Sequence, residues 1–269
     1  MMMFNLIKAQ QYQMLRDNVT YYIIFVMLII YVGIDLISAA DSSTAQFSAS
    51  YFAVISADGF PFLLNMLTLL YTARICGCDM TDRTMNYELL DGVKRSQVFF
   101  ARFIVGVFWS AVTCAFLMIV PTAIVAAFAG WGDMMTVGGA LRRAFCTLIT
   151  VVRLSAMYTM LTFLLMDWKT TTVIGFIIGQ TELIIVMIMQ ESASLGLDKK
   201  AGYFFSATAM QKFLDVSNIG IGYKNGEDIQ IVKSMLTFSD GASCAAVCIG
   251  MTALYLILGF AVFRRRDIK

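Results

Sequence analysis

Long apolar runs with few charges recur along the whole chain and constrain its fold more than any other feature. They lie at about 19–40, 52–75, 98–127, 140–166, 172–190 and 242–263. A helix needs roughly 20 apolar residues to cross about 30 Å of hydrocarbon, where every backbone polar group must be satisfied within the fold. The sequence therefore predicts an all-α membrane protein, a single transmembrane domain over residues 1–269 with six transmembrane helices. Pro61 should break the second span near its outer end.

Composition excludes a soluble fold and several kinds of chemistry. Hydrophobic residues make up 59% of the chain and charged residues 14%, whereas soluble domains have roughly 45–50% and about 25%. With no histidine, the chain cannot build a histidine-dependent triad or an HExxH zinc site. The phosphate-binding pattern GxxxxGK followed by Ser or Thr is also absent. We therefore expect no enzyme activity, no metal site and no cofactor in the chain itself; if ATP drives the protein, another subunit binds it.

The distribution of Lys and Arg predicts the orientation of the chain. An even number of spans places both termini on one side, and short cytoplasmic loops are enriched in Lys and Arg. Twelve of these residues lie on the side of the termini, seven lie on the other side and Arg153 lies within a span. We expect a multi-pass protein of the plasma membrane with both termini in the cytoplasm.

Two segments outside the spans are rich in apolar residues. Within residues 1–18, Phe4 and Ile7 begin a series of apolar residues at near-helical spacing. This pattern predicts an amphipathic helix in the membrane interface, with a solvated leader as the alternative. The outer loop, 191–241, is unusually apolar for an exposed segment. We expect it to pack back on the membrane face as short helices.

The cytoplasmic segment 79–96 has the signals of a short capped helix. Asp79, or a threonine two residues later, can cap its start, and Gly92 fits the position just past its end. Met85 and Leu89 share one face of that helix. Membrane insertion does not require such a helix, so the segment predicts a docking surface for a soluble partner. A plain connecting loop is the alternative.

An unpaired charge inside a membrane span is costly, and four ionisable side chains lie more than four residues from either end of the predicted spans. Asp35 and Asp58 lie nearer the outer ends of the first and second spans. Arg153 lies near the centre of the fourth span and Glu182 near the centre of the fifth. The connection between these two spans, 167–171, is short, so the two helices should be antiparallel neighbours. Helical rise places these two residues within about 5 Å of one another in depth. We expect a structural ion pair between them; the alternative is a proton or substrate path.

Two segments resemble the membrane subunits of type-two ABC exporters, which are permeases that pair with a separate ATP-binding subunit. Residues 4–16 look like the amphipathic connecting helix of that family. In the second segment the resemblance is carried by Asp79, Arg83-Thr84, Leu89-Leu90, Gly92, Arg95 and Arg102. The chain departs from the family pattern at Arg83, where Gly is usual, and at Asp79, where Glu is usual.

The resemblance implies an assembly and a set of coupling residues. The assembly is a dimer of six-span subunits, either a homodimer or a heterodimer with a related permease, bound to two ATP-binding subunits. The residues that would couple to the ATP-binding subunit are Asp79, Arg83, Met85, Glu88, Leu89, Leu90, Gly92 and Arg95. The small chain looks most like the permeases of bacterial peptide or antibiotic export and self-immunity systems.

The main alternative is a secondary transporter or channel that works alone. Its ion path would use the charged side chains within the spans, which are Arg153, Glu182, Asp58 and Asp35. An inverted repeat would favour this hypothesis, but residues 1–130 and 131–269 show no convincing similarity. A third hypothesis, an intramembrane enzyme, is disfavoured by the missing histidines and the missing carboxylate motif. We expect no nucleic-acid partner.

Overall fold

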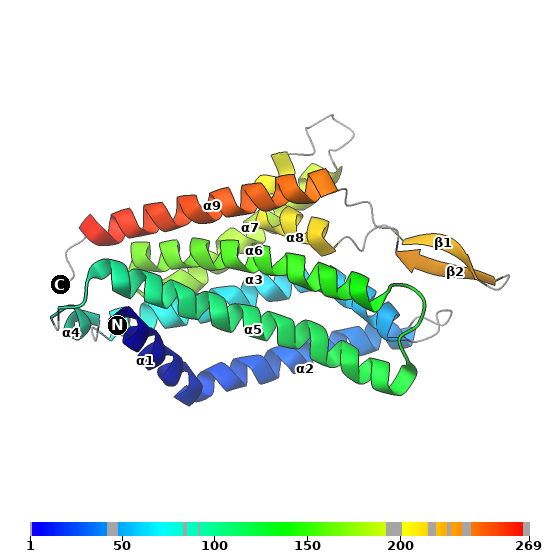
Figure 1. Cartoon of the computed structure of the whole chain (residues 1–269), viewed down its shortest axis with the longest axis horizontal. Coiled ribbons are helices and arrows are strands. Elements are labelled where there is room, and N and C mark those ends of the chain that lie inside the picture. The colour runs from blue at the N-terminus through cyan, green and yellow to red at the C-terminus, as the bar shows by residue number, and fades with distance from the viewer. Residues whose placement is uncertain are drawn as a thin grey trace.

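The computed structural model describes residues 2–41, 48–82, 85–90, 92–191, 201–214, 219–224, 227–232 and 238–265. The elements are, in chain order, α1 (Met2–Arg16), α2 (Asn18–Asp41), α3 (Ala49–Thr81), α4 (Met85–Leu90), α5 (Arg95–Ala129), α6 (Val137–Leu165), α7 (Trp168–Glu191), η2 (Ala201–Phe204), α8 (Ser206–Leu214), β1 (Ile219–Lys224), β2 (Glu227–Val232) and α9 (Phe238–Arg265). Figure 1 shows the long helices in one elongated bundle. The start of α1, α4 and the end of α9 lie at one end of the bundle, here called the α4 end. The β1–β2 hairpin projects from the other end, here called the hairpin end.

Five helices within the described residues, in α3, α5, α6, α7 and α9, are long and apolar enough to cross a membrane. They match five of the predicted spans, and the chain is a predominantly helical membrane protein. Each of these helices begins three or four residues earlier than the predicted span, because the first turn of a helix does not have to be apolar. The first predicted span, 19–40, lies within α2, and some side chains of α2 lie outside the described part.

The central helix of the bundle is α3, which packs against α2, α5, α6 and α7. Phe60 and Leu64 are among its completely buried side chains. α7 approaches α3 closely through Gly175 and Gly179: a Cβ added at Gly179 would lie only 2.6 Å from Asn65 Nδ2. The GxxxG spacing in α7 is therefore a close-packing face, which small residues make possible between membrane helices.

The prediction that Pro61 breaks the second span was wrong. α3 runs without interruption from Ala49 to Thr81 with Pro61 inside it. A proline removes one backbone hydrogen bond and costs an isolated helix about 3 kcal/mol. Here Phe60 and Leu64 are both fully buried, so packing against the neighbouring helices offsets the cost of the proline.

The chain between α7 and α9 contains η2, α8 and a two-stranded hairpin. η2 and α8 pack against α6 and α9. β1 and β2 pair antiparallel, with Ile219 opposite Val232. The hairpin departs from the all-α fold that we expected. Ile219, Ile221 and Tyr223 alternate with other residues at a period of two, which is typical of a strand.

Candidate functional site

The short helix α4 has a tightly closed C-terminus. Gly92 has a backbone φ of 82°, in the left-handed region that glycine adopts at no steric cost. The backbone N–H of Gly92 donates to the carbonyl of Leu89 at 3.2 Å, and that of Val93 donates to the carbonyl of Glu88 at 3.3 Å. These two bonds form a Schellman motif. They confirm the predicted position of Gly92 just past the end of a helix.

We expect Gly92→Ala to destabilise the protein by about 1–2 kcal/mol, the cost of a left-handed conformation for a residue with a Cβ. A Cβ at this position meets nothing within 4 Å, so the loss comes from the backbone alone and not from a clash. Gly92→Asn is the control and should lose less, because Asn tolerates the left-handed region. Thermal unfolding in detergent measures both variants, and equal losses would speak against this explanation.

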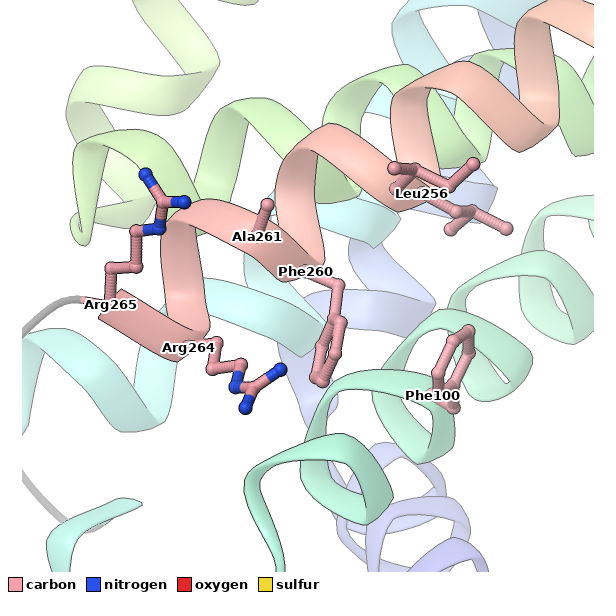
Figure 2. A pocket seen from close by; sticks show the side chains of 7 residues that line it. Phe100, Leu256, Phe260, Ala261, Arg264 and Arg265 are labelled. Atoms are coloured by element: carbon pink, nitrogen blue, oxygen red, sulfur yellow. The ribbon is translucent and has the colours of Figure 1, made fainter.

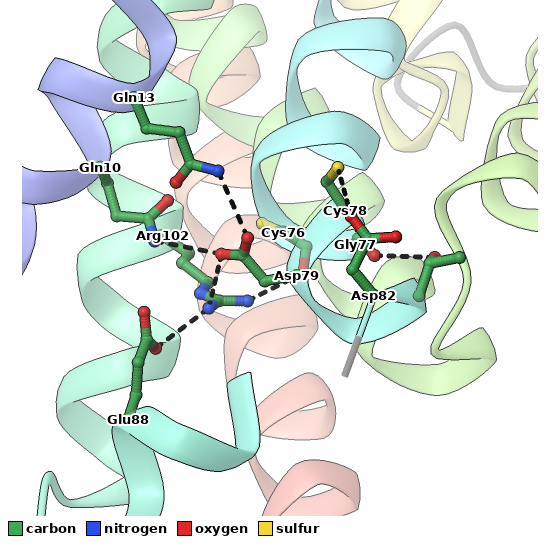
Figure 3. A network of polar contacts seen from close by, with 10 residues as sticks. Gln10, Gln13, Cys76, Gly77, Cys78, Asp79, Asp82, Glu88 and Arg102 are labelled. Atoms are coloured by element: carbon green, nitrogen blue, oxygen red, sulfur yellow. Dashed lines mark hydrogen bonds and ion pairs between the residues drawn. The ribbon is translucent and has the colours of Figure 1, made fainter. Parts of the chain in front are cut away.

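A buried guanidinium holds α4 against the bundle. Arg102 of α5 is 0% exposed. Its Nη2 lies 2.9 Å from Asp79 Oδ2 and 3.0 Å from Glu88 Oε2. Its Nη1 donates to the carbonyl of Cys76 at 3.2 Å. Figure 3 shows the carboxylates of α3 and α4 converging on this one guanidinium, so Arg102 ties α3, α4 and α5 together through charge-assisted hydrogen bonds.

Helix α1 joins the same network. Gln10 Nε2 donates to Asp79 Oδ2 at 3.2 Å, and Gln13 Nε2 donates to Asp79 Oδ1 at 3.4 Å. Asp17, just after α1, forms an ion pair with Arg74 of α3. Several large apolar side chains of α1 remain exposed, among them Phe4, Tyr12 and Leu15. This arrangement suits a helix that lies in the membrane interface.

The apolar residues of the predicted coupling segment point in two directions. Met85 is 1% exposed, and Leu89 packs against the buried cluster that contains Met85. This face of α4, which we expected to dock a partner, is therefore the contact with the bundle. Leu90, in contrast, is 80% exposed. Among the described side chains of α4, Leu90 is the apolar one that a partner could reach.

The described charged residues of the same segment form contacts within the bundle. Asp79, which we expected as a possible cap of α4, instead lies in the last turn of α3. Arg95 Nη1 donates to the carbonyls of Phe263 and Arg264 at 3.1 Å each, and so caps the end of α9. Arg83 lies outside the described residues. The role of Arg102 as the centre of the network was missed, because its two acidic partners lie 23 and 14 residues away in the sequence.

The turn between α6 and α7 is tied to the end of α3. Asp167 Oδ2 accepts the backbone N–H of Thr170 at 2.9 Å and the Thr170 hydroxyl at 2.6 Å, at the start of α7. Its Oδ1 accepts the hydroxyl of Thr81 at 3.0 Å. These hydrogen bonds, first of all the one from the Thr170 hydroxyl, lower the pKa of Asp167 below its ordinary value.

Arg153 and Glu182 bind the two sides of the junction between η2 and α8. Arg153 of α6, which is 2% exposed, donates to the carbonyl of Tyr203 at 3.0 Å and to that of Phe204. Glu182 of α7 accepts the backbone N–H of Ser206 and, at 2.5 Å, the Ser206 hydroxyl. The guanidinium of Arg153 therefore binds the carbonyl groups at the end of η2, and the carboxylate of Glu182 binds the N–H group at the start of α8. Both pairings follow the partial charges of helix ends.

The predicted ion pair between Arg153 and Glu182 was wrong, because the 203–206 segment stands between the two side chains. Arg153 lies sixteen residues after the start of α6, or about 24 Å at the helical rise. η2 and α8 therefore reach deep into the bundle. Backbone polar groups at such a depth need protein partners, and these two charged side chains supply them.

The other two intramembrane acids cannot be placed as side chains. Asp35 lies in α2 and Asp58 lies in α3, and both side chains are outside the described part. Within the residues that the structure describes, no three His, Cys, Asp or Glu side chains gather in a way that could hold a metal ion.

A shallow groove of about 600 Å³ lies between α5 and α9 near the α4 end. Figure 2 shows Phe100, Leu256 and Phe260 beside it and Arg264 and Arg265 at the end of α9. The apolar side chains suit a surface that faces lipid, and the two guanidinium groups suit the level of lipid head groups.

The α4 end is the candidate functional site. It combines an exposed apolar residue, Leu90, with a short helix that buried charges fix to the bundle. Such a surface can dock another protein, since an apolar side chain presented on a rigid helix is a common form of recognition. Comparison with protein-family models and with curated protein sequences finds no match for the chain.

Proposed function

We propose that the chain is the permease subunit of an ATP-driven exporter, which forms the translocation path and couples to a separate ATP-binding subunit at the α4 end. The observation that carries the proposal is the attachment of α4. Its outer side chain Leu90 is exposed, while Glu88 is held by Arg102 and Met85 is buried. A partner that moves α4 therefore also moves α3 and α5, because Arg102 connects all three helices.

The arrangement of the helices supports the topology that this function needs. In the proposal, α2 is the sixth span: its 24 residues measure about 36 Å, enough to cross the hydrocarbon. The α4 end is cytoplasmic, since Arg95, Arg102, Arg264 and Arg265 all lie there. The membrane is a bacterial plasma membrane, and a second permease, identical or related, completes the path.

The alternative of a secondary transporter receives less support from the structure. Its ion path would use Arg153 and Glu182, yet each of these side chains binds backbone groups of the 203–206 segment. Such bonds anchor a re-entrant segment, and a proton carrier that made them would have to break them in every cycle. We therefore favour the ATP-driven exporter.

The test is ATP hydrolysis by the complex purified from the membranes of the cell that makes the chain. The isolated chain should bind no ATP, because it has no phosphate-binding loop. The complex should hydrolyse ATP, and Leu90→Asp should remove the ATP-binding subunit and its activity from the preparation. Because Leu90 is exposed, this substitution should change the free energy of unfolding by no more than about 0.5 kcal/mol.

Two controls make the test specific to the docking residue. Leu90→Met keeps an apolar side chain and should keep the activity. Leu90→Asn removes the apolar side chain without adding a charge and should also release the ATP-binding subunit. Tight ATP binding by the isolated chain, or full ATPase activity in a well-folded Leu90→Asp complex, would refute the proposed function.

A further inference from the structure

A cavity of about 330 Å³ lies between α3, α5 and α6 toward the hairpin end, and Leu214 of α8 also lines it. Ala57, Phe60, Met118 and Ala140 form part of its apolar wall. The volume is about eleven times the roughly 30 Å³ that one water molecule occupies. Each buried water needs two to four polar partners, so walls of this kind favour an apolar occupant.

The uncharged polar groups of the wall are already engaged with the backbone. The hydroxyl of Ser56 donates to the carbonyl of Phe52 at 2.6 Å, and that of Thr122 donates to Met118 at 2.8 Å. The indole Nε1 of Trp131 donates to the carbonyl of Met135. Most of the wall can therefore offer a ligand only apolar contact.

Among the described residues that line the cavity, Arg143 alone is charged, and it is 7% exposed. Arg143 also lines an adjoining hollow of about 450 Å³, together with Arg142 and Asp133. Among the described residues, the charged lining of this hollow is therefore two arginines and one aspartate. The side chain of Arg143, whose Nη1 donates to Met135 Sδ, lies at the junction of an apolar cavity and a polar hollow.

The depth of this junction matches the boundary of the hydrocarbon. The 29 residues of α6 span about 43 Å, so about 6 Å at each end lies beyond a 30 Å hydrocarbon layer. Arg143 follows Val137 by six residues, or about 9 Å. The cavity is also lined by Ile119 and Leu141, which are 48% and 54% exposed, and it therefore opens sideways toward the lipid.

We propose that this cavity binds the acyl chain of an anionic lipid from the surrounding leaflet, with the lipid phosphate held at Arg143. A guanidinium binds phosphate through two parallel hydrogen bonds. A zwitterionic lipid offers the same chain, but its ammonium group would be repelled by the two arginines of the hollow. The site lies within one chain and goes beyond the proposed transport function, on which it does not depend.

Trp131 lines the cavity and provides the test. A variant with Trp109→Phe and Trp168→Phe keeps Trp131 as the single tryptophan of the chain. It is reconstituted in phosphatidylcholine vesicles that contain a minor fraction of lipid brominated on its acyl chain, which quenches nearby indole fluorescence. Brominated phosphatidylglycerol should quench Trp131 at about tenfold lower concentration than brominated phosphatidylcholine, as one charge-assisted hydrogen-bonded contact predicts.

Substitutions separate the head-group contact from the cavity. Arg143→Gln should remove the preference for phosphatidylglycerol, and Arg143→Lys should retain part of it. Ala144→Phe, which fills the cavity from its wall, should remove the strong quenching by both lipids. Lys212→Gln is the matched control, because Lys212 is an exposed cation of α8 that does not line the cavity.

Three results would overturn the proposal. These are equal quenching by the two lipids in the parent variant, an unchanged preference in Arg143→Gln, and loss of the preference when inorganic phosphate replaces chloride at the same ionic strength. The last result would mean that the arginines select a free anion and that the apolar cavity takes no part.

Discussion

Replacing Arg102 with methionine should destabilise the protein by about 3–5 kcal/mol, the range measured when one partner of a buried ion pair is removed. The substitution keeps an apolar stem but removes the cation that Asp79 and Glu88 both face. It also removes the donor to the carbonyl of Cys76. Because Arg102 joins α3, α4 and α5, the same variant should lose the ATPase partner in the proposed complex. Denaturant unfolding in detergent measures the loss of stability.

Two controls separate charge from packing at this position. Arg102→Lys keeps the charge but not the planar guanidinium, so it should lose an intermediate amount. The triple variant Arg102→Met, Asp79→Asn, Glu88→Gln removes both facing carboxylates as well, and it should be more stable than Arg102→Met alone. If the triple variant is as unstable as the single one, the loss comes from packing and the electrostatic account of α4 is wrong.

Arg153→Met and Glu182→Ala should each destabilise the protein by about 3 kcal/mol, and the two losses should not add. Each side chain makes two hydrogen bonds to the 203–206 segment, and a hydrogen bond to a charged group contributes roughly 1.5–3 kcal/mol. Once either side chain is lost, the segment is free to move, so losing the other should cost less. A double-mutant cycle of unfolding free energies measures this coupling.

Local opening of the same segment gives an independent measurement. Lys212 is an exposed residue of α8, and trypsin cleaves after it only when the helix opens. Each single variant should therefore be cleaved faster at Lys212 than the parent protein, and the double variant should be cleaved little faster than either. Strictly additive free energies together with an unchanged rate of cleavage would show that the two side chains do not hold α8.

The helices that cross the membrane could be predicted from the sequence because their determinants are local. A run of apolar residues is expelled from water wherever it lies in the chain, and inside hydrocarbon it must form a helix. The end of α4 is local as well, since the left-handed conformation at Gly92 depends on glycine itself. The amphipathic spacing of α1 belongs to the same class of signal.

The partners of the charged and apolar side chains were decided only by the tertiary structure. Met85 belongs to a buried cluster whose other buried members come from four other helices, α3, α5, α6 and α9. Pro61 stays inside a helix whose side chains on either side of it in the sequence, Phe60 and Leu64, are buried against other helices. Arg153 and Glu182 do lie on neighbouring helices, but a segment from twenty or more residues further along the chain fills the space between them. Hydropathy and spacing describe each segment by itself, whereas a buried charge binds whichever polar groups the folded chain brings within reach.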